Sequence, residues 1–241
     1  MNSRQKLIIL LAVVLAILLY VAPKTASEKK QDVKDVGDFI AQFEEAKENI
    51  SSEQKNIFNR IEQGLKKAQT DNSEQAWIAS AGDFLKGARL VHNDKKAVLY
   101  QGAISGFEKA LVLNPNNLSA KTNLGTSMVE SASLLGNQPM KGISLLREVI
   151  QKDSNNIEAN LQLGLFSVTS QQFNKAIERF QRILRIDSTN IDMYVYLGDT
   201  YLTMGEKQKA IENYENYKAR LKDTLIIKNI EEHIKKLKQT N

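Results

Sequence analysis

One short pattern returns three times between Leu118 and Leu221, and it limits the folds that this chain can adopt. A loop tetrapeptide is followed at once by an aliphatic residue, and a Leu-Gly pair begins six residues after that aliphatic residue. The aliphatic residues are Leu118, Ile157 and Ile191, so the pattern returns after 39 and then 34 residues. Fixed periods of this size predict stacked helical hairpins. The tetrapeptides are NPNN, DSNN and DSTN, and the pairs are Leu124-Gly125, Leu163-Gly164 and Leu197-Gly198.

A second cluster repeats further along each unit. A small residue stands four positions before a large one in AISGF (103–107), GISLL (142–146), AIERF (176–180) and AIENY (210–214). Gly or Ala on the inner face of a helix lets a second helix approach closely, and the large residue four positions later fills the adjacent groove. The two clusters together predict two closely packed helices in each unit.

These residues make the units similar to tetratricopeptide repeats. In the last unit, six residues match the types that the family has at the corresponding positions: a large residue, Leu, Gly, Tyr, Ala and an aromatic residue. These residues are Tyr194, Leu197, Gly198, Tyr201, Ala210 and Tyr214. The middle unit keeps Leu163, Gly164, Ala176 and Phe180, but it has Asn160 and Ser167 where bulky residues are usual.

The unit that starts at Leu118 departs further from the family pattern. It keeps Leu124 and Gly125, has Met128 and Gly142 at the Tyr and Ala positions, and carries five extra residues between its helices. The resemblance covers residues 96–221 well and residues 73–94 only loosely. It implies an all-α fold, a right-handed superhelix of helical hairpins.

The regions on either side of the repeats suggest a fuller organisation of the chain. Residues 39–50 and 57–65 have apolar residues at helical spacing, and the pair Ser51-Ser52 is the expected N-cap of the second of these helices. Residues 225–237 form a one-sided apolar stripe, which suits a helix that caps the last repeat. We therefore expect a cytoplasmic tail (1–6), a transmembrane signal anchor (7–22), a stalk (23–35), a divergent hairpin (36–72), a degenerate repeat (73–117), a repeat with an insertion (118–156), two regular repeats (157–190 and 191–222) and a capping helix (223–241).

The N-terminal segment predicts attachment to a membrane. Residues 7–22 contain no polar group except the Tyr20 hydroxyl, and as a helix they would be roughly 24 Å long, against about 30 Å for a bilayer core. A cut after Ala22 would leave Tyr20 three positions upstream, which disfavours a cleaved signal peptide, although a cut after Ser27 stays open. The count of Lys and Arg on the two flanks does not decide the orientation. The short basic head resembles an export signal, so we expect the repeats on the periplasmic side of a bacterial inner membrane.

Composition and motifs argue against catalysis. The chain has no Cys, which excludes disulfides, thiol catalysis and Cys-ligated metals, and its net charge of +5 comes from interspersed charges typical of a solvated helical surface. The sequence contains no phosphate-binding loop, no HExxH and no nucleophilic triad. Trp77 is expected in the core, while His92 and His233 lack partners at metal-ligand spacing. We expect no enzyme activity, no cofactor, no metal and no small-molecule substrate.

A stack of such hairpins has a concave surface lined by the first helix of each unit. If residues five, nine and twelve of each unit face that groove, the lining is apolar with hydroxyl groups and one acid. It would suit a peptide or an amphipathic helix of a partner protein. Family members that hold the acidic tails of heat-shock chaperones use Lys, Asn and Arg at these places, and these positions carry no Lys or Arg here. The expected lining is Thr122, Thr126, Val129, Leu161, Leu165, Val168, Val195, Asp199 and Leu202.

The sequence therefore predicts a membrane-anchored, non-catalytic scaffold that binds proteins, in a layout similar to single-span repeat proteins that accompany the bacterial translocon and envelope chaperones. Two other functions remain open. One is a homo-oligomeric component of an envelope machine, in which the groove receives a second copy. The other is a cytoplasm-facing solenoid that binds RNA or protein. The insertion at residues 131–141 is interpreted as a lengthened helix end with a turn, with a partner-binding loop as the alternative.

Overall fold

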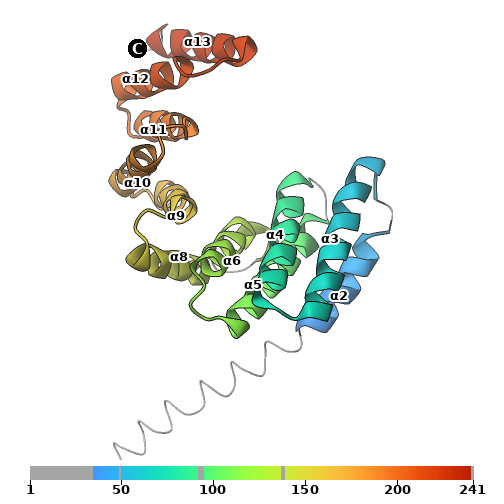
Figure 1. Ribbon diagram of the computed structural model, residues 1–241. Helices are drawn as coiled ribbons and strands as arrows, with labels where there is room; N and C mark the ends of the chain where they lie inside the picture. Colours follow the sequence, from blue (N-terminus) through green and yellow to red (C-terminus); the bar gives the residue numbers. More distant parts are fainter. Residues whose placement is uncertain (1–34, 49, 92–94, 137–138, 240–241) are drawn as a thin grey trace, which may run out of the picture. The chain divides into compact units, whose positions relative to one another are not determined.

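The computed structural model describes residues 35–48, 50–91, 95–136 and 139–239, and these residues are entirely helical and connecting segments (Figure 1). They form two compact units, an N-terminal unit described from residue 35 to residue 109 and a C-terminal unit described from residue 110 to residue 239. None of the described helices is both long enough and apolar enough to cross a membrane. The predicted tail (1–6) and anchor (7–22) lie outside the described residues, as does the predicted stalk up to residue 34.

The N-terminal unit contains α2 (Asp35–Ala46), α3 (Ser52–Asp71), α4 (Glu74–Leu90) and most of α5 (Lys96–Leu113). Phe43 of α2 has no exposed surface, and its ring centroid lies 5.7 Å from that of Phe58 and 5.1 Å from that of Phe84. These three rings join α2, α3 and α4 in one core. The predicted N-cap is confirmed, because the Ser51 hydroxyl accepts a hydrogen bond from the Gln54 backbone N–H and the Gln54 side chain accepts one from the Ser51 N–H.

Trp77 lies in the core of the N-terminal unit, as the sequence predicts. Its side chain is 7% exposed, and its indole Nε1 donates a hydrogen bond to the Asn72 side chain at 3.0 Å. A buried indole N–H needs such a partner, because an unmade hydrogen bond in the core costs free energy. Trp77 therefore has a structural explanation that requires no ligand.

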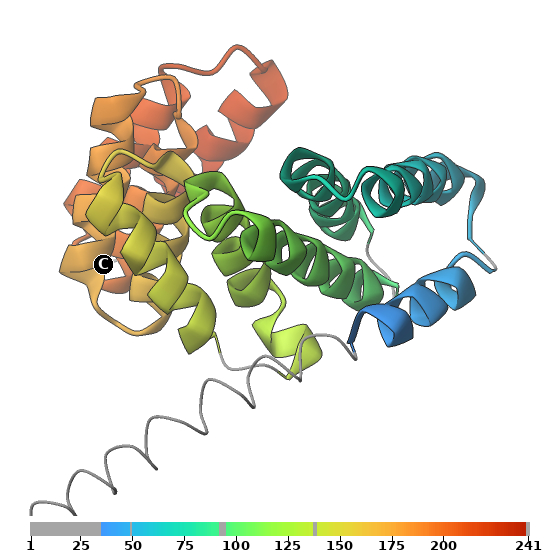
Figure 2. The same cartoon turned by 60° about the horizontal axis from the view of Figure 1, so that its bottom comes forward.

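The C-terminal unit contains three long hairpins, a short extra helix and a terminal helix (Figures 1 and 2). The hairpins are α6 (Leu118–Glu130) with α8 (Met140–Lys152), α9 (Ile157–Thr169) with α10 (Phe173–Ile186), and α11 (Asp192–Thr203) with α12 (Lys207–Lys218). The terminal helix is α13 (Thr224–Gln239). From α8 to α13, each helix packs against the next one in the chain.

The loop tetrapeptides form the same turn three times. The first residue of each, Asn114, Asp153 or Asp187, accepts a hydrogen bond through its side chain from the backbone N–H two residues later, at 3.2, 3.0 and 2.9 Å. Its backbone carbonyl accepts another from the N–H three residues later. Asn117 and Asn156 then cap α6 and α9 by accepting from the third residue of each helix. This chemistry explains why Asp and Asn recur at these positions.

The turns inside the last two hairpins also match, with an offset of 34 residues. Gln171 and Gly205 have φ of 59° and 77°, a left-handed conformation that closes a helix end. The next N–H in each turn donates to the carbonyl five residues earlier, from Gln172 to Ser167 at 2.7 Å and from Glu206 to Tyr201 at 2.9 Å. The two units therefore repeat in backbone hydrogen bonding as well as in sequence.

The Leu-Gly pairs place a glycine where two helices cross. A Cβ added at Gly164 would lie 2.6 Å from the Phe180 ring, and one added at Gly198 would lie 2.6 Å from the Tyr214 ring. In the first hairpin the corresponding neighbour of Gly125 is Leu146, with its Cγ at 2.8 Å. The missing side chain of each glycine makes room for the large residue of the facing helix, which is the arrangement that the two repeated clusters predict.

The insertion forms a separate element. Helix α6 ends at Glu130, and residues Ala132–Leu135 form the four-residue helix α7, which ends at Gly136 with φ of 66°. The insertion therefore extends the end of the first helix by a short helical segment and a turn, as expected, although Ser131 separates this segment from α6. Gly136, in the left-handed conformation, ends α7.

Helix α13 covers the end of the array, and its apolar stripe is shorter than predicted. Ile234 is buried in a cluster with Ala210, Ile211 and Tyr214, and Ile230 and Leu237 pack against that cluster. The prediction was wrong for Leu225 and Ile226, which are 67% and 39% exposed. These two residues lie in the first turn of α13, and neither packs in the cluster that α12 and α13 form.

Candidate protein-binding groove

The predicted groove residues come from the first helices α6, α9 and α11, but the two threonines of α6 do not offer an accessible surface. Thr122 is 4% exposed and Thr126 has no exposed surface. The Thr122 hydroxyl donates to the Leu118 carbonyl at 2.8 Å and accepts from the Asn156 amide at 3.4 Å, while Thr126 donates to Glu158. The prediction that Thr122 and Thr126 line an open groove was therefore wrong, because α9 covers that face of α6.

Helix α9 carries three predicted groove residues that are partly exposed. Leu161, Leu165 and Val168 pack with part of their surface on a core cluster formed by α10 and α11. This cluster contains Ala176, Ile177, Phe180, Ile183, Met193 and Leu197. The remaining surface of the three side chains is accessible, so α9 presents an apolar band that the core supports from behind. Val129 of α6 is also partly exposed and packs on the core cluster of the first hairpin.

Helix α11 adds two partly exposed apolar residues and one exposed acid. Val195 and Leu202 are partly buried, and Leu202 packs on the cluster between α12 and α13. Asp199 is exposed, and one of its carboxylate oxygens accepts a hydrogen bond from the Tyr214 hydroxyl at 2.6 Å. Burial of the phenol, and then this hydrogen bond to a carboxylate, raise the pKa of Tyr214 well above its usual value. The Tyr214 hydroxyl therefore keeps its proton at neutral pH and donates it to Asp199.

Hydrogen bonds between polar side chains join α6 and α9, and the sequence did not predict them. The Gln162 amide donates to Glu130 at 3.0 Å and to Glu158 at 3.2 Å, and Glu158 also accepts from Thr126. Gln162 is only 5% exposed, so these polar side chains fill the space between the two helices. The sequence does show polar residues among the apolar ones of α6 and α9. Which of these residues hydrogen-bond to each other depends on how the two helices pack, and the sequence does not show this.

The residues that define the repeats mostly lie in the interior. Tyr201 is partly exposed, with the Lys209 ammonium 5.3 Å from its ring centroid. Asn160, at a position where bulk is usual, has no exposed surface, and its amide donates to the Ser154 and Asn156 carbonyls. The buried repeat residues are Leu124, Gly125, Leu163, Gly164, Ala176, Phe180, Leu197, Gly198, Ala210 and Tyr214.

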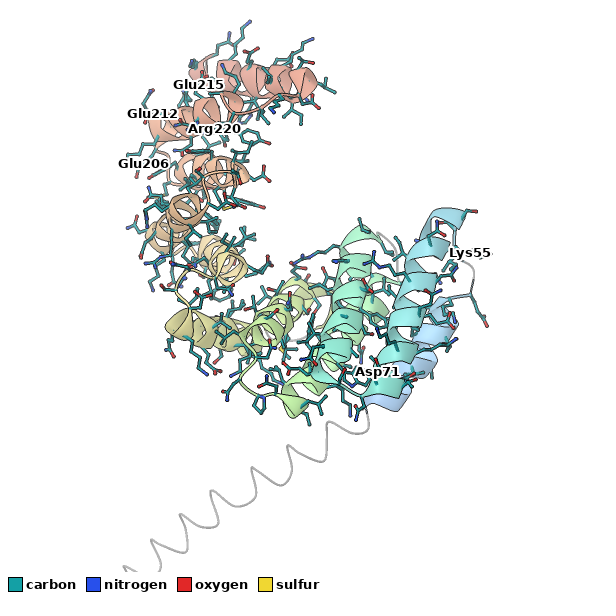
Figure 3. All side chains as sticks on the ribbon, viewed as in Figure 1. Lys55, Asp71, Glu206, Glu212, Glu215 and Arg220 are labelled. Atoms are coloured by element: carbon teal, nitrogen blue, oxygen red, sulfur yellow. The ribbon has the colours of Figure 1, made fainter. Side chains whose placement is uncertain are left out.

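The described residues contain no group of His, Cys, Asp and Glu side chains that could hold a metal ion. His233 is exposed, with its ring edge-on to the Tyr214 ring at 5.0 Å between centroids, and His92 lies outside the described residues. The C-terminal unit offers partly exposed apolar side chains on α9 and α11, and the exposed Asp199 carboxylate on α11. Figure 3 draws the side chains on these helices and labels Glu206, Glu212, Glu215 and Arg220 of the same unit.

Comparison with known proteins places part of this unit in a family. Residues 191–217 match the family model for the tetratricopeptide repeat. No curated protein matches the chain significantly. A crystal structure of MamA is similar with 26% identity over 57% of this chain and 84% of that chain, at a TM-score of 0.47. YrrB, described as a TPR protein with an unusual peptide-binding site, has 19% identity over 70% of this chain and 97% of that chain, at a TM-score of 0.45.

A third similar structure is TTC0263, a thermophilic TPR protein of Thermus thermophilus, with 13% identity over 76% of this chain and 100% of that chain, at a TM-score of 0.49. The family match covers α11 and nearly all of α12. In the two preceding hairpins, as in this one, a glycine of the first helix lies against a large side chain of the second helix. The described residues therefore form an all-α array of helical hairpins of the tetratricopeptide-repeat type, and residues 191–217 match the tetratricopeptide-repeat family.

Proposed function

We propose that this protein is a non-catalytic scaffold whose C-terminal unit binds a peptide or an amphipathic helix of a partner protein along α9 and α11. The observation that carries the proposal is the band of partly exposed apolar residues on these two helices. It consists of Leu161, Leu165, Val168, Val195 and Leu202. Covering apolar surface of this kind contributes about 25 cal/mol per Å² removed from water.

The partly buried state of these side chains also favours a binding role. Leu161, Leu165, Val168 and Leu202 each pack on a core cluster, so these four side chains have little freedom left to lose when a partner covers their exposed side. Pre-ordered surfaces bind with a smaller entropic cost than mobile ones. Asp199 stands among them and would favour a partner segment that carries Lys or Arg next to its apolar side chains.

The proposal includes anchoring to a membrane. Residues 7–22 are the basis for it, because they form an apolar run behind a short basic head. A scaffold held at the periplasmic face of a bacterial inner membrane would bring its partner to that surface, for instance during protein export or envelope assembly.

Photocrosslinking in intact cells tests the groove. A benzophenone amino acid is placed at Leu165, in the middle of the band on α9, and in a second variant at Lys209, an exposed residue of α12. We expect the Leu165 variant to give a discrete adduct with one or a few proteins on illumination, since a bound segment must pass this residue. The Lys209 variant controls for chance encounters at the surface.

Mass spectrometry of the adduct distinguishes the outcomes. An adduct with another envelope or export protein supports the proposal, and an adduct with a second copy of this chain replaces it with a homo-oligomeric role. If Lys209 gives the discrete adduct and Leu165 gives none, the groove on α9 and α11 is not the binding site.

A further inference from the structure

The turn between α9 and α10 lines a pocket of about 280 Å³ on the C-terminal unit. The first turn of α10 and Met204, which follows α11, complete the lining. The described lining contains none of the groove residues of α9 and α11. Sites for whole small molecules usually measure about 300 to 1,000 Å³, so this pocket suits a single large side chain better. The lining residues are Gln171, Gln172, Phe173, Asn174, Lys175 and Met204.

The pocket combines apolar surface with one positive charge. Phe173 and Met204 are partly exposed, and Met204 is held from behind because it packs on the core cluster of α10 and α11. The Lys175 ammonium donates a hydrogen bond to the Gln172 side-chain oxygen at 2.7 Å. Within the part of the chain that the structure describes, Lys175 has no carboxylate at ion-pair distance, and the lining contains no acidic residue. The pocket therefore complements an apolar group that carries a negative charge.

Gln171 keeps a side chain at a position where glycine would be more stable. Its φ is 59°, and the equivalent residue of the next hairpin, Gly205, has φ of 77°. A residue with a Cβ is disfavoured in this left-handed conformation, whereas glycine adopts it readily. The Gln171 carboxamide makes no hydrogen bond to another described residue, so no contact within the fold offsets this cost. Strained residues of this kind are concentrated at functional sites, and this one lines the pocket.

We propose that the pocket binds the C-terminal residue of a partner protein. An apolar last side chain would lie against Phe173 and Met204, while its α-carboxylate would accept hydrogen bonds from Lys175 and from the carboxamides of Gln171 and Asn174. An ammonium group has three N–H donors, of which Gln172 takes one, and each carboxamide has two. Hydrogen bonds from an ammonium group to a carboxylate are charge-assisted and therefore strong.

The lining favours a protein C-terminus over a fatty acid, which also joins a carboxylate to an apolar group. Carboxamide groups both donate and accept, so Gln171 and Asn174 can pair with the last peptide group of a chain as well as with its carboxylate. A fatty acid offers no peptide group, and its long acyl chain needs more apolar room than one side chain.

A minimal ligand tests the pocket in the full-length chain, kept in a neutral detergent at low salt. N-acetylphenylalanine has one apolar side chain, one peptide group and a free carboxylate. The protein is labelled with ¹³C-methyl methionine, and Met204→Leu identifies the Met204 signal among those of the five methionines. We expect a saturable shift of the Met204 methyl signal. N-acetylphenylalanine amide should bind about tenfold more weakly or worse, because it lacks the charge.

Two variants test the assigned roles. Lys175→Gln should weaken binding of the free acid about tenfold, and Lys209→Gln is the matched control. Lys209 has the equivalent place in the next hairpin, is exposed and pairs with Glu206, so its loss should leave binding unchanged. Gln171→Gly should weaken binding and at the same time raise the midpoint of urea unfolding, because it removes the carboxamide and relieves the strained conformation. A purely structural role would not produce these opposite effects.

Four results would overturn the proposal. The first is that N-acetylphenylalanine causes no saturable shift of the Met204 signal. The second is that the amide binds as tightly as the free acid, since the carboxylate would then play no part. The third is tighter binding of hexanoate, which would assign the pocket to fatty acids. The fourth is that Gln171→Gly, or Lys175→Gln relative to Lys209→Gln, leaves binding unchanged.

Discussion

Replacing Phe180 by alanine is expected to lower the free energy of unfolding by about 3 to 5 kcal/mol, the range for a fully buried Phe. Phe180 has no exposed surface, and its ring stacks on that of Tyr196 with centroids 5.3 Å apart. The same ring fills the space that Gly164 leaves in α9. The substitution would therefore open a cavity where α9, α10 and α11 meet, and neighbouring helices could close it only in part.

Urea unfolding followed by far-ultraviolet circular dichroism measures this loss. Phe173 provides a matched control, since it lies in the first turn of the same helix and is partly exposed. Phe173→Ala should cost clearly less than Phe180→Ala because less apolar surface is buried there. Similar losses in the two variants would contradict the assignment of Phe180 to the packing centre of the repeat.

Gly142→Ala is expected to destabilise the protein although alanine is the better helix former. A Cβ at this position would lie 2.6 Å from the Gly125 carbonyl oxygen and 2.9 Å from the Met128 Cβ. The carbonyl belongs to the backbone of α6 and cannot rotate away, so α6 and α8 would have to separate. Overpacking of this kind costs about 1 to 3 kcal/mol, against a gain of about 1 kcal/mol in helix propensity. A net loss in the midpoint of urea unfolding is the expected measurement.

Gly82→Ala is the control for this prediction. Gly82 also lies inside a helix, α4, but a Cβ there would meet no atom within 4 Å. This variant should be more stable than the wild type by about 0.5 to 1 kcal/mol, because alanine has the higher helix propensity and its Cβ meets no neighbouring atom. If both alanine variants were stabilised to the same degree, the close approach of α6 and α8 would be wrong.

The repeated hairpins could be predicted from sequence because their determinants are local. Asp153 and Asp187 accept hydrogen bonds within their own loops, and Gly164 and Gly198 lie where the two helices of their own hairpin pack together. The predicted boundaries at residues 156/157 and 190/191 accordingly lie in the loops that precede α9 and α11.

The groove was harder to predict because exposure depends on contacts between repeats. Thr126 has the same place in its unit as Leu165 in the next, yet Thr126 is buried against α9 while Leu165 is partly exposed. The repeat period and the residue types do not determine how much of the first helix of one repeat is covered by the first helix of the next repeat.

Thiol labelling measures the accessibility of the groove most directly. The chain has no cysteine, so single variants Thr126→Cys, Leu165→Cys and Lys209→Cys each report one position when the folded protein reacts with a maleimide. We predict fast labelling at the exposed position 209, slower but clear labelling at 165, and labelling at 126 only after unfolding in urea. Labelling at 165 that also requires unfolding would show that the surface along α9 is closed, and the proposed binding of partner segments there would be contradicted.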